Sequence, residues 1–422
     1  MVEFYSNGSF PMAAGAAACA SLVSANDDAL LGTYAKSITP SPESEAVRAL
    51  IAFNLAERYR LLAHARHEFL SAGRRAGLEF PHNYCRTAKC KYVQYGSEYV
   101  GVYVAPEFGS AFYSGLVTCG SVWACPVCSA KVQQRRRGEV SEAIDWAHEN
   151  GLQSVMVTLT FPHCNWHKLK KLLLQQRMAL QRLRAGGPWN RFKQRFGYHY
   201  LIRALEVTHG ENGWHPHVHE LWFVDGNADA DEMQTVILRM WESACQRAGL
   251  NTSANREAFH KHSVDIKGHC SNSDYLVKQD DSRHWGADRE IATATTKAGK
   301  AKGLHPFGLL ARAADGDRRA GRLFLTYALA MKGQRQLVWS PGLKRVVGLR
   351  EITDESLAEQ KKEAADLLGM LSSEDWKRVR SANKRAQVLL AAERGGWPAI
   401  QELILTLRTM GVVARSSFVL TS

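Results

Sequence analysis

The sequence lacks any apolar run of about 18 residues, the length that a helix needs to cross a membrane. Residues 10–25 are small and apolar, as in the core of an export signal, but the residues before them lack the basic charge of such signals. The G-x-x-x-x-G-K-[ST] motif of P-loop motors is also absent. We therefore expect a cytoplasmic protein with no membrane partner and no helicase motor of its own.

Acidic residues are in short supply relative to basic ones. The 41 Asp and Glu residues stand against 54 Lys and Arg residues, which leaves a formal net charge of +13. A charge of this sign suits a polyanionic partner, and nucleic acid is the first candidate. The chain has 422 residues and 45% apolar content, which is more than one ordinary hydrophobic core accommodates, so two or three domains are expected.

The nine cysteines do not suggest a disulfide framework, because their number is odd and no export signal is recognisable. Cys125-Pro-Val-Cys128 forms a C-x-x-C pair, Cys85 and Cys90 form a looser pair, and Cys119 is a fifth candidate ligand. Structural zinc takes four ligands, so four of these five would bind a structural Zn²⁺, with Cys85 the weakest candidate. Buried or redox-active thiols are the alternative interpretation.

Composition and periodicity divide the chain into four parts. Residues 1–43 are rich in Ala, Ser and Gly and are expected to be disordered. Residues 44–150 begin with a helix, because apolar residues recur every three or four positions, and continue into the Cys-rich zinc-type module and a basic helix. Residues 151–350 contain most of the strand-like segments, and residues 351–422 are charged and predicted to form a helical C-terminal region.

Strands and helices alternate through residues 151–350 in the order βαββαβα. This order predicts an α+β fold with a central antiparallel sheet and flanking helices. The expected strands are residues 153–161, 198–208, 214–224 and 263–267, and the expected helices are residues 166–185, 229–249 and 272–279.

The most informative of these segments is the strand with the sequence Gly-Trp-His-Pro-His-Val-His-Glu-Leu. Alternate residues of a strand share a face, so His215, His217 and His219 project together. Two imidazoles two residues apart on a rigid strand can bind one divalent cation. Three histidines on a surface strand without a metal are the alternative.

The hairpin that precedes this strand supplies a third ligand. A turn at Glu211-Asn212 places Glu206 opposite His217, whereas a turn at Asn212-Gly213 places it opposite His219. In either register the carboxylate reaches a histidine. Two histidines and one carboxylate leave coordination positions open for a phosphate oxygen and water, as a catalytic site requires.

A tyrosine follows the next expected strand, in the sequence Ser-Asp274-Tyr275-Leu-Val-Lys278. On a helix Lys278 would lie beside the phenol of Tyr275. Because a tyrosine has a pKa near 10, an adjacent ammonium and a metal-polarised phosphate would both help it to act as a nucleophile. Tyr198 and Tyr200 are the alternative nucleophiles, but they belong to the strand that leads into Glu206 and are expected to pack within the sheet.

Together these motifs resemble those of the rolling-circle replication initiators of small bacterial plasmids, within the His-hydrophobic-His (HUH) endonuclease superfamily. The resemblance extends from about Cys119 to Leu349. It comprises the cysteine segment that ends at Cys128, Thr158-Leu-Thr-Phe-Pro-His163, the histidine strand, and Tyr275-Leu-Val-Lys278, in the order of that family.

The resemblance implies an HUH nuclease domain with Mg²⁺ or Mn²⁺ on the face of the sheet. Tyr275 would attack the scissile phosphate, remain joined to the 5′ end and release a 3′-OH primer. The implied partners are bacterial plasmid origin DNA, single-stranded at the nick site, a host helicase and polymerase, and a second copy of the chain in a homodimer. Some relatives end the cycle with a carboxylate four residues before the tyrosine, where this chain has Ser271, and Asp274 is the nearest substitute.

Three other functions remain open from the sequence. A conjugative relaxase has the same chemistry. A non-enzymatic zinc DNA-binding regulator explains the cysteines but gives no reason for the Glu-His hairpin. A histidine-triad nucleotide hydrolase has alternating histidines, but it leaves the positive charge and Tyr275 unexplained, and Glu220 stands where it would have an apolar residue.

Overall fold

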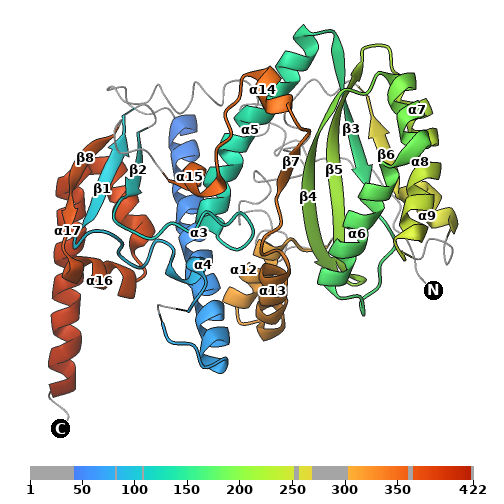
Figure 1. Cartoon of the computed structure of the whole chain (residues 1–422). Coiled ribbons are helices and arrows are strands. Elements are labelled where there is room, and N and C mark those ends of the chain that lie inside the picture. Colours follow the sequence, from blue (N-terminus) through green and yellow to red (C-terminus); the bar gives the residue numbers. More distant parts are fainter. Residues whose placement is uncertain are drawn as a thin grey trace. The chain divides into compact units, whose positions relative to one another are not determined.

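This computed structural model describes residues 42–80, 83–106, 109–250, 256–268, 303–359 and 365–419 (Figure 1). The chain divides into two compact units. The first comprises Met1–Ala63, Ala88–Thr118 and Glu359–Ser422, and the second comprises His64–Thr87 and Cys119–Ala358. Helix α3 (Pro42–Arg75) contributes residues to both, and it corresponds to the helix predicted at the start of residues 44–150.

The second unit is built on a five-stranded sheet with the order β6-β3-β5-β4-β7. All neighbouring strands run antiparallel. The predicted α+β class with a central antiparallel sheet is therefore confirmed. The strands are β3 (Leu152–Leu159), β4 (Tyr200–Gly210), β5 (Gly213–Asp225), β6 (Val264–Lys267) and β7 (Leu337–Trp339).

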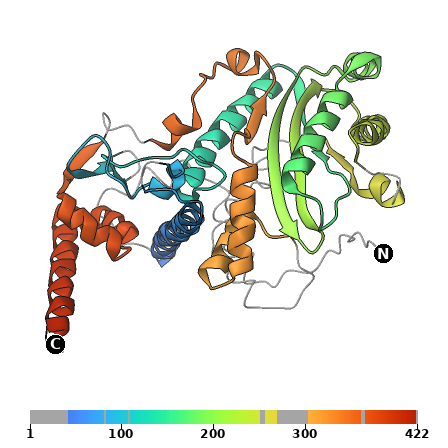
Figure 2. The same ribbon diagram turned by 60° about the horizontal axis from the view of Figure 1, so that its bottom comes forward.

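Helices cover both faces of this sheet (Figures 1 and 2). One face packs against α5 and α14, and the other packs against α6, α7 and α8. The shorter helices lie at the ends and edges. The helices of this unit are α5 (Pro126–Glu149), α6 (Leu169–Leu183), α7 (Gly186–Phe196), α8 (Ala230–Arg247), α9 (Arg256–His262), α12 (Pro306–Ala314), α13 (Arg318–Ala330), α14 (Leu343–Val347) and α15 (Asp354–Ala358).

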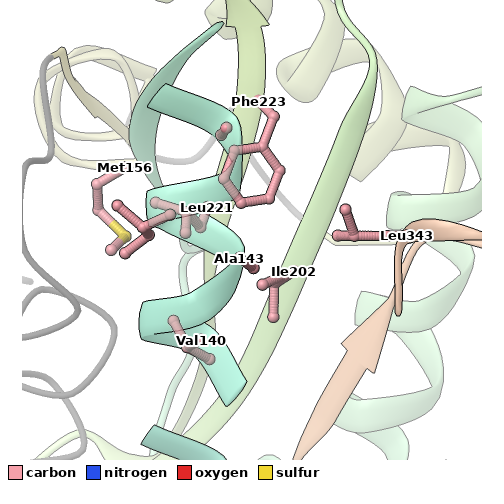
Figure 3. Close-up of a cluster of buried hydrophobic side chains, with 9 residues drawn as sticks. Val140, Ala143, Met156, Ile202, Leu221, Phe223 and Leu343 are labelled. Atoms are coloured by element: carbon pink, nitrogen blue, oxygen red, sulfur yellow. The ribbon is translucent and has the colours of Figure 1, made fainter. Parts of the chain in front are cut away.

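The face that packs against α5 also carries the histidines. Leu221 and Phe223 of β5 are buried in a cluster with Val140 of α5 (Figure 3), and burial of such side chains contributes roughly 1.5–3 kcal/mol each. Side chains alternate along a strand, so His217 and His219 extend from the same face of β5 as Leu221. The apolar core therefore holds one end of the strand rigid, and the histidines occupy the other end.

On the opposite face of β5, Glu220 is buried because basic and polar side chains pair with it. Glu220 is fully buried, where Arg203 Nε donates to its Oε1 at 2.6 Å and Trp222 Nε1 donates to its Oε2 at 2.7 Å. Arg184 of α6 forms a further ion pair with it. Although burial raises the pKa of this carboxyl group, the two arginines lower it below its usual value. Glu220 is thus a charged anchor between β5 and the helices that cover this face.

The first unit contains a three-stranded sheet with the order β2-β1-β8. The helical C-terminal region predicted over residues 351–422 contains α16 and α17, but it also contains the strand β8, which pairs antiparallel with β1. At Gly369 of β8 the ring of Trp397 approaches so closely that a Cβ atom would lie 2.4 Å from it. The elements of this unit are β1 (Val100–Ala105), β2 (Ser110–Tyr113), β8 (Asp366–Leu371), α16 (Ser373–Ser381) and α17 (Arg385–Val419, kinked at Gly395 and Gly396).

The short helix α4 (Arg86–Lys89) lies where the division between the two units falls in the sequence. Within the described parts of the chain, none of the helices combines the length and the apolar character needed to span a bilayer.

Candidate active site

The hairpin formed by β4 and β5 brings the predicted metal ligands together. Gly210 pairs with Gly213, so the two-residue turn is Glu211-Asn212, one of the two registers that the sequence allowed. In this register Glu206 lies directly opposite His217. Glu206 Oε2 lies 3.1 Å from His217 Nε2 and 3.3 Å from His219 Nε2. Each of the three residues offers one ligand atom, and these atoms all lie within 4.8 Å of one another.

The hydrogen bonds of the two imidazoles leave one nitrogen of each facing the carboxylate. His217 Nδ1 lies 3.4 Å from the carbonyl oxygen of His215, which can only accept, so the proton belongs on Nδ1. His219 Nδ1 lies 3.1 Å from Thr158 Oγ1. His219 Nε2 is buried and makes no hydrogen bond within the described residues, despite its approach to Glu206. Two nitrogen lone pairs facing a carboxylate oxygen is the arrangement that a divalent cation fits.

The charges at this group are strongly coupled. Burial alone would raise the pKa of Glu206, but His217 and His219 hold it well below its usual value. Burial opposes a charge on His217, yet Glu206 raises the pKa of that imidazole. A cation bound here would compete with protons for these nitrogen and oxygen atoms.

The third histidine of the strand is engaged elsewhere. His215 Nε2 lies 2.6 Å from Thr160 Oγ1, and its ring stacks on His163 with the centroids 4.6 Å apart. Burial, reinforced by the neighbouring histidines, lowers the pKa of His215 well below its usual value, so this imidazole is neutral. His215 thus packs beside Glu206, His217 and His219 and is not part of that group of possible ligands.

The contribution of the Thr158-Leu-Thr160 strand was missing from the sequence-based prediction of the site. Both threonines project onto the histidine face of the sheet, since Thr158 pairs with His219 across β3 and β5 and Thr160 bonds His215. The signal was present in the sequence, because alternate residues of a strand share a face. The threonine hydroxyls orient the histidine rings.

A further histidine approaches the site from a distant part of the chain. His209 N donates to Leu304 O and Leu304 N donates to His209 O, each at 2.8 Å, so residues 303–305 run alongside β4. His305 then caps α12, with its Nδ1 accepting from Phe307 N at 3.2 Å. Burial lowers the pKa of His305 well below its usual value. No local motif marks this residue, so sequence reasoning could not include it.

The predicted nucleophile lies outside the described residues, as do Lys278, Asp274 and Ser271. The alternative tyrosines are described, and both pack among aromatic rings. Tyr198 is 5.0 Å from the ring of Trp189, and Tyr200 is 5.9 Å from the ring of Trp146, measured between centroids. Burial raises the pKa of Tyr198, which makes that phenol harder to ionise.

Four of the five predicted zinc ligands form a second group. Cys90, Cys119, Cys125 and Cys128 are buried, and their sulfur atoms lie within 4.8 Å of one another, so they could bind a metal such as zinc. Cys85 is exposed and is not part of the group, in agreement with its rank as the weakest candidate.

The C-x-x-C pair begins helix α5, where Cys128 N donates to Cys125 Sγ at 3.4 Å. Cys119 Sγ lies 3.7 Å from Cys128 Sγ. The start of a helix stabilises a thiolate, because the backbone N–H groups there point toward it.

We expect purified protein to contain about one Zn²⁺ per chain in elemental analysis. Cys125→Ser should lose that zinc and lower the unfolding temperature, because structural zinc contributes folding energy directly. Cys245→Ser is a suitable control, since Cys245 is a buried residue of α8 outside the cysteine group, and its replacement should leave the zinc content unchanged. Protein that was never exposed to a chelator and contains no zinc would contradict this assignment.

Comparisons with known proteins place the chain in a family. The family model for replication proteins matches residues 116–385. A Streptomyces lividans protein named "Protein rep" is 28% identical over 312 residues, which cover 59% of this chain and 68% of that protein. A Streptomyces cyanogenus protein named "Neomycin resistance protein" is 31% identical over 189 residues, which cover 36% of this chain and 43% of that protein. No solved structure matches the chain.

The family match covers both the histidine hairpin and the cysteine segment from Cys119 to Cys128. The resemblance to replication initiators that the motifs indicated is thereby confirmed. Because the matched residues make up more than half of the sequence, this chain belongs to the family of replication proteins.

Proposed function

We propose that this replication protein starts rolling-circle replication of a plasmid by nicking and joining one strand of the origin in a metal-dependent reaction. The observation that carries the proposal is the convergence of His217 Nε2 and His219 Nε2 on Glu206 Oε2, with the His219 nitrogen buried and without a hydrogen bond. This donor set with open positions is typical of a catalytic cation rather than a structural one.

In the proposed reaction Glu206, His217 and His219 would hold Mg²⁺ or Mn²⁺, which would polarise the scissile phosphate and neutralise the charge that develops on it. The phenol of Tyr275 gives up its proton to water and its oxygen attacks phosphorus. An O–P bond forms, and the bond to the 3′ oxygen breaks. The 3′ oxygen takes up a proton and becomes the primer. Lys278 would favour the ionised phenol, and Asp274 is the candidate for the group that ends the cycle.

The positions of the described residues on either side of the segment that contains Tyr275 support this role. The described residues stop at Gly268, directly after β6, which pairs with β3. They resume at Gly303, beside His209 of β4. The segment that contains Tyr275 is therefore attached at both ends to the sheet that carries the metal group.

The proposed partners follow from the same chemistry. The net charge of +13 suits origin DNA, and a nickase needs that DNA single-stranded at the scissile phosphate. A host helicase and polymerase would extend the 3′-OH primer, since no P-loop motif occurs in the sequence. We also propose a homodimer and a bacterial cytoplasmic location.

The test is incubation of the protein with single-stranded DNA from its plasmid origin, with Mn²⁺, with Mg²⁺ and with a chelator. Nicking at one position with either ion, and none with the chelator, is the expected result. Tight origin binding without nicking under any condition would refute the nickase and favour a zinc DNA-binding regulator.

Thr158 offers a prediction about metal affinity. Its hydroxyl fixes the ring of His219, so Thr158→Val should weaken Mn²⁺ binding by about 10–100-fold, as loss of such an outer partner commonly does. Binding is measured by electron paramagnetic resonance titration of Mn²⁺. Thr158→Ser should restore the affinity. The matched control is Thr160→Val, which removes the same hydroxyl beside His215; an equal loss there would show that Thr158 has no specific role.

A further inference from the structure

Helices α12 and α13 present four arginines to solvent. Arg312, Arg318, Arg319 and Arg322 are all exposed, and they are called the arginine surface below. Arg318 and Arg322 are one turn apart on α13, with Arg319 between them. Arg312 lies next to the start of α13, because its carbonyl oxygen accepts from Asp317 N at 3.0 Å. Within the described chain none of these four guanidinium groups forms an ion pair.

Other arginines of the same unit are used to hold the fold together. Arg136 Nη1 lies 2.8 Å from Glu139, and its Nη2 lies 2.9 Å from Asp354. Arg184 and Arg203 neutralise buried Glu220. The four arginines of the arginine surface make no ion pair of this kind within the described residues.

The position of these arginines on α13 also opposes the stability of the helix. Its first turn contains no acidic residue and begins with Arg318 and Arg319, although the N-terminal end of a helix favours negative charge. Helix α8, by contrast, has Asp231 and Glu232 in its first turn. The carboxylate of Asp317 caps this end of the helix by accepting from Arg319 N and Ala320 N, and the exposed guanidinium groups remain available for another anion.

Helices α12 and α13 lie at the hairpin end of β4 and β5, the end of the sheet that carries Glu206, His217 and His219. Leu304, two residues before α12, pairs with His209 of β4, and Tyr327 of α13 stacks on Trp214 at 6.3 Å between ring centroids. Burial and the charge of Arg319 lower the pKa of His209, the residue of β4 that pairs with Leu304. Figures 1 and 2 both show α12 and α13 beside the end of the sheet where β4 turns into β5.

We propose that the arginine surface binds the phosphate backbone of the single-stranded origin DNA beside the nick site. The inference rests on the proposed function, because it assumes that the metal group acts on DNA. Each guanidinium offers paired N–H donors that match a phosphate, and a strand held by the arginine surface would lead directly to the metal group. The contacts would fix the position of the strand without reading its sequence.

The test is the salt dependence of binding to a fluorescent single-stranded origin oligonucleotide, measured by anisotropy in the presence of a chelator. For single strands each phosphate contact contributes about 0.7 to the slope of log K against log salt. The triple variant Arg318→Ala, Arg319→Ala, Arg322→Ala should therefore reduce the slope by about 2 and weaken binding about 100-fold near 0.1 M salt.

The matched control removes three exposed arginines from α7 and α8, which cover the face of the sheet opposite the histidines. These are Arg191→Ala in α7 with Arg239→Ala and Arg247→Ala in α8, which change the net charge by the same amount. The control should bind with an unchanged slope. If the slope fell equally in the two triple variants, net charge alone would explain the effect and the proposal would be overturned. An unchanged slope in the α13 variant would also overturn it.

Thermal unfolding and nicking are measured on the same variants, so that a loss of DNA binding can be distinguished from a loss of folding or of activity. Removal of cations from the start of α13 should leave the thermal unfolding temperature unchanged or raise it. If it falls, the single variants Arg318→Gln and Arg322→Gln are used, each with an expected slope change of about 0.7. If the protein never nicks DNA but shows these slope changes, the arginine surface is supported and the proposed nickase function is refuted. If it nicks DNA and the slopes do not change, the nickase function is supported and the arginine surface is refuted.

Discussion

Replacement of His217 by alanine should abolish metal-dependent nicking of the origin strand while leaving origin binding nearly intact. His217 is one of two imidazoles directed at Glu206 Oε2, and without it the cation loses a ligand at the centre of the group. Loss of about 4 kcal/mol of charge stabilisation corresponds to a rate about 10³-fold lower. The measurement is the initial rate of nicking of a labelled oligonucleotide at saturating Mg²⁺, together with its binding affinity.

The control for this variant is His199→Ala. His199 is exposed on the approach to β4 and pairs with Asp225 at the end of the sheet far from the turn, so its loss should not change the nicking rate. Glu206→Gln keeps the shape of the side chain and removes its charge, so it should raise the Mn²⁺ concentration needed for half-maximal nicking. Full activity of His217→Ala in Mg²⁺ would rule out the metal assignment.

Replacement of Tyr275 by phenylalanine should stop both nicking and joining, with folding and DNA binding unchanged. A broken phosphodiester can be rejoined only if its energy is kept in a covalent bond to the protein, and the variant removes the single oxygen that would form that bond. The measurement is conversion of a labelled origin strand to the nicked product, followed by transfer to a second strand. Mn²⁺ affinity should not change, because Tyr275 is not a proposed ligand.

Tyr200→Phe is the matched control for the nucleophile. It removes the same oxygen from a tyrosine whose ring packs against Trp146 in the sheet, so nicking should continue at the normal rate. Loss of activity in Tyr200→Phe together with full activity in Tyr275→Phe would identify Tyr200, not Tyr275, as the nucleophile.

Local patterns were sufficient to predict the metal hairpin. Glu206 and His217 are separated by 11 positions, and strand alternation with a two-residue turn determines which side chains meet. The pattern could not choose between the two turn registers. That choice depends on Gly213, where φ is +82° and a Cβ atom would come within 2.7 Å of Asn165.

Features that depend on distant pairing were missed. Strand β8 was read as helix because its partner β1 is more than 250 positions away, with Val100 opposite Leu371. His305 reaches the site only because Leu304 pairs with His209. Long-range contacts of this kind leave no periodic signal in the local sequence.

The buried charge of Glu220 is another feature that local reading could not explain. Its partners Arg184 and Arg203 come from α6 and β4, and the sequence alone does not show that these three side chains meet. Once paired, the carboxylate is compatible with a buried strand position.

The most direct test of the account is to map the covalent product of the reaction. The protein is incubated with a labelled origin strand and Mn²⁺, denatured, digested with protease, and the peptide that carries DNA is sequenced by mass spectrometry. The account predicts an adduct that requires a divalent cation, disappears in His217→Ala, and joins the 5′ phosphate to Tyr275. An adduct on another residue, or nicked DNA with free 5′ ends and no adduct, would contradict it.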